Sequence, residues 1–174
     1  MADHQHRLYL TLHVKGGAPV VPVQDDNGPT TQDEESKGYR YQARKRTIGP
    51  DTSLWQYDQI ETTMLPSAQT LVRIVLGKVV DLGKIHHILS NVPLRPEEEG
   101  WDSIVWVKEG IEALLREEDA AVEFAEGVTW ENVRVWAMWY VGKKEREHRF
   151  DGEVSFDPLR TPTWDMFCLE ETEP

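Results

Sequence analysis

Hydrophobic and polar residues alternate near the beginning of the chain. Residues 7–14 place leucine or valine at every second position, with tyrosine, histidine and polar side chains between them. Because neighbouring side chains of a β-strand point to opposite faces, this pattern predicts a half-buried strand with Leu8, Leu10 and Leu12 facing inward. The next apolar stretch, residues 18–23, contains two prolines, which lack the backbone N–H of an internal strand, so we expect at best an edge strand there.

Three more strand-like segments follow a long polar stretch. Residues 24–38 are rich in acidic and turn-forming side chains, which predicts a mobile loop. Tyr39–Arg44 and Leu54–Thr62 predict the two strands of a hairpin, because the Gly-Pro-Asp sequence between them suits a turn. Leu71–Leu76, rich in valine, isoleucine and leucine, predicts a buried strand, although its pattern also fits a helix.

Apolar residues of the second half recur three and four positions apart, as they do on one face of an α-helix. This spacing predicts a short helix that Asp81 caps and a last helix that begins after Thr129. Between them, a strong helix is expected to begin near Asp102 or Ser103. Its expected buried stripe consists of Ile104, Val107, Ile111, Leu114 and Leu115.

Strands precede helices along the chain, and this order defines the expected fold. It is typical of an α+β domain with helices on one face of a mainly antiparallel sheet. We therefore expect residues 1–174 to form a single domain, a small, mostly antiparallel sheet with about three helices packed on one face. The aromatic tail from Phe150 is expected to pack back on this body, while residues 1–6 and 170–174 are expected to fray.

Charge and cysteine content narrow the classes of partner. The 174 residues carry 19 basic and 31 acidic side chains, a net charge of −12, which opposes binding to nucleic acid or to an anionic membrane. No stretch reaches the ~20 apolar residues of a membrane span, and the single Cys168 excludes an internal disulfide. Without the pattern of a signal peptide, a cytoplasmic protein is expected, with no prediction of its oligomeric state.

Histidines and glycines give little sign of metal or nucleotide chemistry. His86 and His87 are adjacent, so a helix would turn them about 100° apart, and the six histidines show no metal-ligand spacing. Gly16-Gly17 lacks the lysine and the spacing of a phosphate-binding loop. The sequence therefore predicts no metal and no cofactor, and the expected partner is a small molecule or another protein.

A basic cluster spans the first strand of the expected hairpin and the start of the turn that follows it. Arg40, Arg44, Lys45 and Arg46 stand beside Tyr39 and Tyr41. Basic groups interleaved with aromatic rings can contact single-stranded nucleic acid. A cation-rich strand that deters edge-to-edge aggregation explains the same residues, and the acidic balance of the chain favours that interpretation. RNA contact through Arg40–Arg46 is therefore the weaker alternative.

Ser103 is the strongest candidate nucleophile, because it lies in the first turn of the strongest expected helix. The helix dipole would stabilise an anion there, but a serine also needs a base within hydrogen-bond reach. His13, His86 and His87 are candidate bases only by elimination. The alternative is that Asp102 or Ser103 caps the helix, and the residue pattern favours this second interpretation.

Tryptophan is frequent, with seven residues, and six of them lie in the second half. Most would pack in the core, but one or two could line a ligand pocket, since an indole combines an apolar body with a polar N–H. The candidate binding residues are Trp101, Asp102, Trp106 and Gln42.

Several segments together resemble an uncharacterised family of small fungal proteins, over roughly residues 7 to 167. The segments that carry the resemblance are RLYLTL at 7–12, GYRYQAR at 38–44, LVRIVLGKV at 71–79, VPL at 92–94, WDSIVWV at 101–107 and PTWD at 162–165. The resemblance implies a permuted papain-like fold, similar to that of lecithin–retinol acyltransferases and bacterial cell-wall peptidases, in which a histidine precedes a catalytic cysteine.

This chain departs from that pattern at each chemical position. Ala18–Gln24 contains no histidine where the family carries a Tyr-His-Trp strand, Gln42 replaces a second histidine and Ser103 replaces the cysteine. An unassisted serine is a far weaker nucleophile than a thiolate. The resemblance therefore implies a degenerate, non-catalytic binding or interaction protein. The alternative is a papain-like hydrolase or acyltransferase that uses Ser103.

Overall fold

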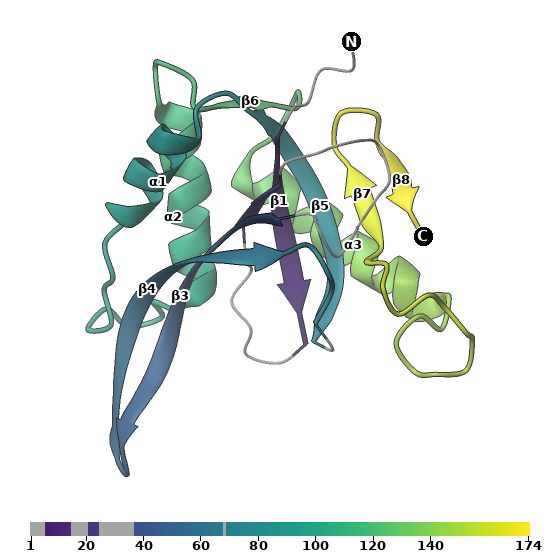
Figure 1. Ribbon diagram of the computed structural model, residues 1–174, viewed down its shortest axis with the longest axis horizontal. Helices are drawn as coiled ribbons and strands as arrows, with labels where there is room; N and C mark the ends of the chain where they lie inside the picture. The colour runs from purple at the N-terminus through teal and green to yellow at the C-terminus, as the bar shows by residue number, and fades with distance from the viewer. Residues whose placement is uncertain (1–5, 15–20, 25–36, 68) are drawn as a thin grey trace.

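The computed structural model describes residues 6–14, 21–24, 37–67 and 69–174, and one sheet forms its centre (Figure 1). Among these residues the sheet has eight strands, seven of them in the order β4-β3-β2-β1-β5-β7-β8, while β6 pairs with β5. All neighbours are antiparallel except β5 and β7. The strands are β1 Arg7–His13, β2 Val21–Gln24, β3 Lys37–Gly49, β4 Thr52–Thr63, β5 Thr70–Val79, β6 Val122–Phe124, β7 Thr163–Asp165 and β8 Glu170–Glu173.

Three helices of the described chain pack on one face of this sheet, and a single large hydrophobic core joins the two layers (Figure 1). They are α1 Leu82–Ser90, α2 Ser103–Arg116 and α3 Trp130–Arg146. The sheet contributes Leu8, Leu10, Tyr41, Ala43, Val72, Ile74 and Leu76 to the core, and the helices contribute Ile85, Leu89, Trp106, Val107, Ile111, Leu114, Val133, Ala137 and Tyr140. The expected α+β class is confirmed.

Residues of β1 and β5 alternate between the two faces of the sheet. Leu10 lies opposite Ile74 on the helix-covered face, whereas the next pair, Thr11 and Arg73, lies on the other face. We call this other face the open face, because α1, α2 and α3 all pack on the opposite side. A small hydrophobic cluster is separate from the main core and consists of Tyr9, Met64 and Val75.

Side-chain caps begin the three helices at the positions that the sequence indicates. The Asp81 carboxylate accepts a hydrogen bond from the Lys84 backbone N–H at 2.9 Å. The Thr129 hydroxyl accepts one from the Asn132 N–H at 3.2 Å. These bonds satisfy amide groups that the first turn of a helix leaves without an intrahelical partner.

Two members of the expected buried stripe of α2 are exposed, and the prediction is wrong for both: Ile104 is 50% exposed and Leu115 is 36% exposed. Trp106, Gly110 and Leu114 belong to the buried stripe, which shifts its centre away from Ile104. Ile104 also lies in the first turn of the helix, at the margin of the core. Leu115 is similarly at the edge of this stripe.

The two ends of the chain differ from what the sequence predicts. Residues 170–174 were expected to fray, but Glu170–Glu173 form β8, which pairs with β7 and buries Glu173. At the beginning of the chain, the His6 carbonyl accepts a hydrogen bond from the Val79 N–H at 2.7 Å, so His6 is tied to β5, and residues 1–5 of the segment expected to fray lie outside the described residues. The tail packs back on the body as expected, because Trp164 stacks on Trp136 of α3 with ring centroids 5.2 Å apart.

The expected edge strand is instead an internal one. β2 lies between β1 and β3, although it pairs with β1 through only two residue pairs. A proline is compatible with this position because the pairing with β1 involves Val23 and Gln24 and leaves Pro22 outside it. Of the expected mobile loop 24–38, residues 25–36 lie outside the described residues, and both its ends belong to strands.

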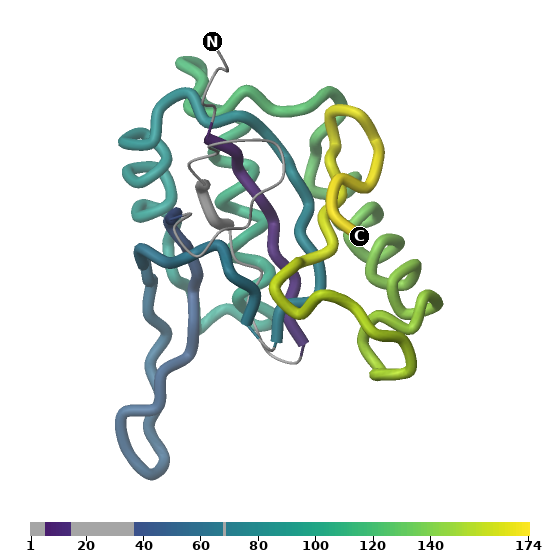
Figure 2. The backbone as a smooth tube through the Cα atoms, turned by 45° about the vertical axis from the view of Figure 1, so that its right-hand side comes forward, coloured from purple at the N-terminus to yellow at the C-terminus, as the bar shows by residue number. Residues whose placement is uncertain are grey.

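The β3–β4 hairpin extends well beyond the rest of the sheet (Figures 1 and 2). It packs through aromatic rings against α2 and the residue before its cap, with Tyr57 against Trp106 at 5.7 Å and Trp55 against Trp101 at 5.0 Å between centroids. β4 is the outermost strand on this side of the sheet.

Candidate functional site

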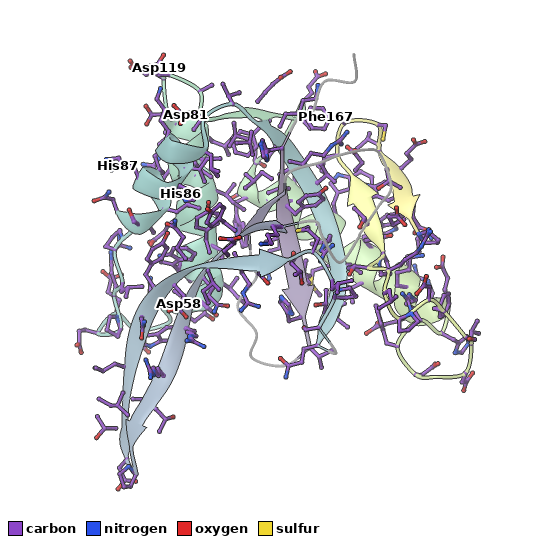
Figure 3. All side chains as sticks on the ribbon, in the orientation of Figure 1. Asp58, Asp81, His86, His87, Asp119 and Phe167 are labelled. Atoms are coloured by element: carbon purple, nitrogen blue, oxygen red, sulfur yellow. The ribbon has the colours of Figure 1, made fainter. Side chains whose placement is uncertain are left out.

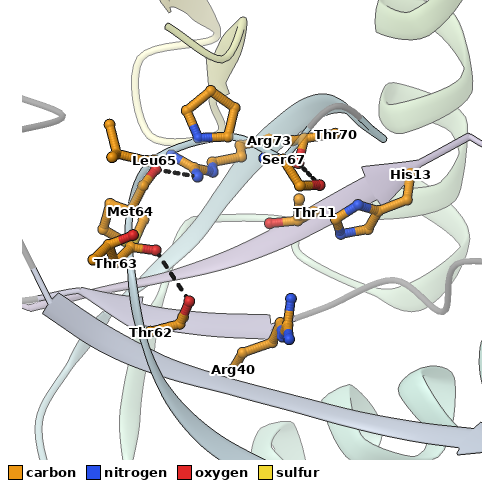
Figure 4. Close-up of a pocket in the computed structure, with 11 residues that line it drawn as sticks. Thr11, His13, Arg40, Thr62, Thr63, Met64, Leu65, Ser67, Thr70 and Arg73 are labelled. Atoms are coloured by element: carbon orange, nitrogen blue, oxygen red, sulfur yellow. Dashed lines mark hydrogen bonds between the residues drawn. The ribbon is translucent and has the colours of Figure 1, made fainter. Parts of the chain in front are cut away.

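A cavity of 260 Å³ opens on the open face of the sheet, where β1, β3 and β5 meet the segment that joins β4 to β5 (Figure 4). Its lining residues are Thr11, His13, Arg40, Thr62, Thr63, Met64, Leu65, Pro66, Ser67, Thr70 and Arg73. Two of these are arginines and none is acidic.

Strand alternation places the polar side chains of this cavity. Thr11 and His13 are two residues apart on β1, so they point to the same face. Arg73 lies opposite Thr11 on β5, and Arg40 reaches toward both β1 residues from β3 (Figure 4). Three strands of the sheet therefore bring together side chains that are spread over 63 positions of the sequence, from Thr11 to Arg73.

Arg73 is buried, with 5% of its surface exposed, and no carboxylate of the described residues forms an ion pair with it. Its Nη2 donates to the Met64 carbonyl at 2.5 Å, but its Nε has no partner. Burial lowers the pKa of the Arg73 guanidinium to about 10, although the neighbouring Tyr9 opposes the shift. Arg73 is therefore charged at neutral pH and not neutralised by a described acid.

Four buried polar atoms without a hydrogen-bond partner surround this one cavity. They are Thr11 Oγ1, His13 Nε2, Arg40 Nε and Arg73 Nε. Buried polar groups are normally hydrogen-bonded, and each one left unpaired costs about 1–3 kcal/mol. Their concentration at one point gives the cavity an unusual capacity for hydrogen bonding.

His13 is uncharged at neutral pH in this environment. Burial, the charge of Arg40 and the charge of Arg73, in that order, lower its pKa to about 4. The cavity therefore combines two positive charges with a neutral imidazole and a buried threonine hydroxyl. Such a set can hold an oxyanion, but it lacks a carboxylate that could orient His13 as a general base.

The predicted binding residues Trp101 and Trp106 lie elsewhere, in the core between the hairpin and α2. They are 8% and 1% exposed, and the Trp106 Nε1–H donates to the Val92 carbonyl at 3.4 Å. Both rings contact aromatic residues of β4 and take no part in the cavity. Their burial supports the interpretation of most tryptophans as core residues.

Asp102 is the cap of α2, and Ser103 is its first residue. The Asp102 carboxylate accepts hydrogen bonds from the Ile104 and Val105 N–H groups at 2.8 and 2.9 Å. Within the described part of the chain, no residue makes a hydrogen bond with the Ser103 hydroxyl. The arrangement matches the cap interpretation, with Asp102 in the capping role.

Gln42 lies on the open face, whereas Ser103 lies in the helical layer on the other face. The Gln42 amide donates to Asp58 Oδ2 at 3.3 Å, and Asp58 also forms an ion pair with Arg44. The two neighbours of Gln42, Tyr41 and Ala43, face the core. The sheet thus separates the two substituted positions that the papain-like resemblance would relate to catalysis.

The adjacent histidines of α1 diverge as expected (Figure 3). His86 Nδ1 shares a hydrogen bond of 2.9 Å with the Tyr41 hydroxyl, while His87 is exposed. One group of possible metal ligands occurs among the described residues, namely His148, Asp151 and Glu153, all exposed. His148 Nδ1 already lies 2.7 and 3.0 Å from the two carboxylates.

Two signals in the sequence point to the cavity, although the candidate residues predicted from the sequence do not include them. Arg73 interrupts an otherwise apolar strand, and a buried arginine is uncommon unless it is paired. Thr11 and His13 occupy the polar positions of the first alternating strand. The sequence alone gives no sign that Arg40 approaches these residues, because that depends on β2 lying between β1 and β3.

Taken together, the fold and the cavity define an α+β protein with a cationic pocket on the open face of its sheet. The chain matches a family of unknown function, DUF6914, over residues 5–173, and it belongs to that family. Comparisons with curated proteins and with solved structures gave no match. Membership of an uncharacterised family is confirmed, whereas the fungal origin and the papain-like relationship stay predictions.

Across the described residues, every helix is too short or too polar to cross a membrane.

Proposed function

We propose that this protein is a non-catalytic binding protein whose open-face cavity holds the anionic group of a small ligand. The observation that carries the proposal is the convergence of four unpartnered buried polar atoms on one cavity. Two of them belong to guanidinium groups, which bind carboxylate and phosphate oxygens well. An oxyanion would give each of these atoms a partner and would offset positive charge in the cavity.

The absence of catalysis is part of the proposal. In the described residues, Ser103 has no base within hydrogen-bond reach, and the cavity contains no acid to activate His13. A degenerate relative of papain-like enzymes that kept the domain and lost its chemistry fits these features. We place this binding protein in the cytoplasm.

The test is stabilisation of the protein by inorganic phosphate and by sulfate, with chloride at matched ionic strength as the reference. At ten times its Kd, an anion should add about 1.4 kcal/mol to the free energy of unfolding, which corresponds to about 3–5 °C in Tm. Isothermal titration calorimetry should give one site per chain.

Variants separate binding in the cavity from general charge effects. Arg73→Met and Arg40→Gln should lose the stabilisation by phosphate. The matched control is Arg46→Gln, which removes an exposed arginine further along the same face of β3 and should respond as the wild-type protein does. Equal stabilisation of Arg73→Met and wild type, or no stabilisation beyond that of chloride, would contradict the proposal.

A further inference from the structure

We propose that the ligand is a small phosphate monoester bound through its dianionic phosphate, and that His13 takes up a proton as the phosphate binds. This inference rests on the proposed function and assigns a ligand class to the same cavity. Three independent features carry it: the charge of the cavity, its size and lining, and the groups that face His13.

Charge favours a dianion over a monoanion. Arg40 and Arg73 bring two positive charges, and no described residue of the lining is acidic. Among the described residues, neither arginine has a carboxylate partner. A carboxylate or a phosphate diester carries one negative charge and would leave one guanidinium uncompensated, whereas a phosphate monoester carries close to two at neutral pH. Because Arg73 is buried, the uncompensated charge is costly there.

The donors approach from different strands, which suits a tetrahedral group. Thr11 lies on β1, Arg40 on β3 and Arg73 on β5, and each has a polar atom without a partner in the cavity (Figure 4). A phosphate monoester offers three terminal oxygens that accept hydrogen bonds. A carboxylate offers two oxygens in one plane, so it would satisfy such a set less completely.

Size and lining limit the rest of the ligand. The cavity of 260 Å³ is below the roughly 300–1,000 Å³ of sites for drug-sized molecules. Met64, Leu65 and Pro66 form an apolar wall beside Arg73, and hydroxyl groups line the rim. The rim hydroxyls belong to Thr62, Thr63, Ser67 and Thr70. The organic part of the ester is therefore short, with an apolar or hydroxylated surface.

The charged groups that face His13 among the described residues are both positive. Arg40 faces it from β3 and Arg73 from β5, while the remaining lining residues carry hydroxyl or apolar side chains. A dianion between the three side chains would replace repulsion by attraction. The His13 pKa, about 4 in the free protein, would then rise, so the affinity for an anion of fixed charge should increase as the pH falls from neutral toward 4.

The experiment compares four probes by calorimetry at pH 7.5: methyl phosphate, sulfate, dimethyl phosphate and acetate. Methyl phosphate and sulfate should bind at least tenfold more tightly than the two monoanions. Proton uptake is measured with sulfate, which does not itself titrate, at pH 5.5 in two buffers of different ionisation enthalpy. The wild-type protein should take up protons, and His13→Gln should not.

A second measurement needs no variant to fold. The histidine ring signals of the wild-type protein are followed by NMR as a function of pH, with and without sulfate, and the His13 signal should move to a higher apparent pKa with sulfate. Equal affinities for all four probes, or an unshifted His13 signal, would overturn this inference while anion binding still stands. Failure of every anion to bind would overturn the proposed function as well.

Discussion

At the scale of single residues, several side chains of the cavity destabilise the protein when no ligand is bound, because their buried polar atoms have no hydrogen-bond partner. Arg73 is the clearest case, because burial of its guanidinium without a described carboxylate costs free energy. Natural proteins tolerate such costs at functional sites. The same residue should therefore oppose stability in the free protein and support it when an anion is bound.

This trade-off predicts the effect of Arg73→Met on the free protein. The variant removes a buried charge and one hydrogen bond to Met64, and it keeps most of the side-chain volume. We expect the free energy of unfolding in urea, without added anion, to stay within about 1 kcal/mol of wild type or to rise. A loss of more than about 2 kcal/mol would show that Arg73 is a structural residue.

His13 makes the stability of the free protein depend on pH. Its pKa is lowered from 6.5 to about 4, so below pH 6.5 the unfolded chain binds a proton that the folded protein does not. Stability should therefore fall as the pH drops from 6.5 to 4. In His13→Gln, the loss over this range should be smaller by about 2 kcal/mol, after allowance for partial solvent exposure. Urea unfolding at several pH values measures it, and parallel curves for the two proteins would contradict the prediction.

Asp102 and Ser103 offer a paired test of the cap and of catalysis. Asp102→Ala removes both accepted hydrogen bonds and should cost about 1 kcal/mol, whereas Ser103→Ala should cost less than about 0.5 kcal/mol. A serine-directed fluorophosphonate should leave Ser103 unlabelled. Stoichiometric labelling, or ester hydrolysis that Ser103→Ala abolishes, would establish the hydrolase alternative instead.

At the scale of elements, the sequence predicts best where one local signal is sufficient. The caps Asp81 and Thr129 identify their helices, because a short polar side chain precedes each helical stripe. The long alternating or apolar segments that became β1 and β5 are also identified correctly as strands. These signals depend on neighbouring residues only, so they need no knowledge of the fold.

The sequence does not predict the strands that form only by pairing with residues far away in the chain. β6 and β7 have three residues each, too few for a periodic pattern, and they form because β5 supplies their hydrogen bonds. Gly77 shows the closeness of that contact, since a Cβ there would lie 2.4 Å from Val122 Cγ1. The highly charged sequence of β8 predicts a free tail. In the structure, Lys143 and Lys144 of α3 form ion pairs with Glu171 of this strand.

The attachment of β8 to α3 predicts a specific loss of stability. Lys144 is 1% exposed, and its Nζ lies 2.8 Å from Glu171 Oε2 and 2.8 Å from Glu147 Oε2. Glu171→Gln would leave the buried ammonium with one carboxylate, so we expect a loss of about 1–3 kcal/mol by chemical denaturation. Glu170→Gln, an exposed neighbour on the same strand, is the control and should change stability by less than about 0.5 kcal/mol. Equal effects of the two changes would contradict this role of Glu171.

At the scale of the whole molecule, the sequence predicts the class of fold but not the position of the site. Apart from Gln42, the expected site residues lie in α2 or just before it, whereas the cavity lies on the other face of the sheet. The strand order decides this, because it brings Arg40 beside His13 and Arg73. The hydrophobic pattern of a single strand does not show which strands will be its neighbours in the sheet.

The charge of the whole chain predicts weak binding to nucleic acid. The net charge is −12, and Arg44 of the basic cluster is paired with Asp58. In fluorescence anisotropy at an ionic strength of about 0.15 M, single-stranded RNA should show no submicromolar binding. A submicromolar affinity that falls steeply with salt and is lost in Arg46→Gln would instead establish the RNA alternative.

The two walls of the cavity belong to parts of the sheet that should differ in hydrogen-exchange behaviour. β5 has β1 on one side and both β6 and β7 on the other, so its amides should exchange only when the whole domain opens. Arg40 lies on β3 between the four-residue strand β2 and the edge strand β4, and beyond this point the hairpin has only its own two strands (Figure 2). Arg73 is thus anchored in the slowest-exchanging strand, while Arg40 stands on a more rapidly fluctuating one. A bound anion would join the two, and the slowing of exchange along β3 would report how strongly the anion stabilises this wall of the cavity.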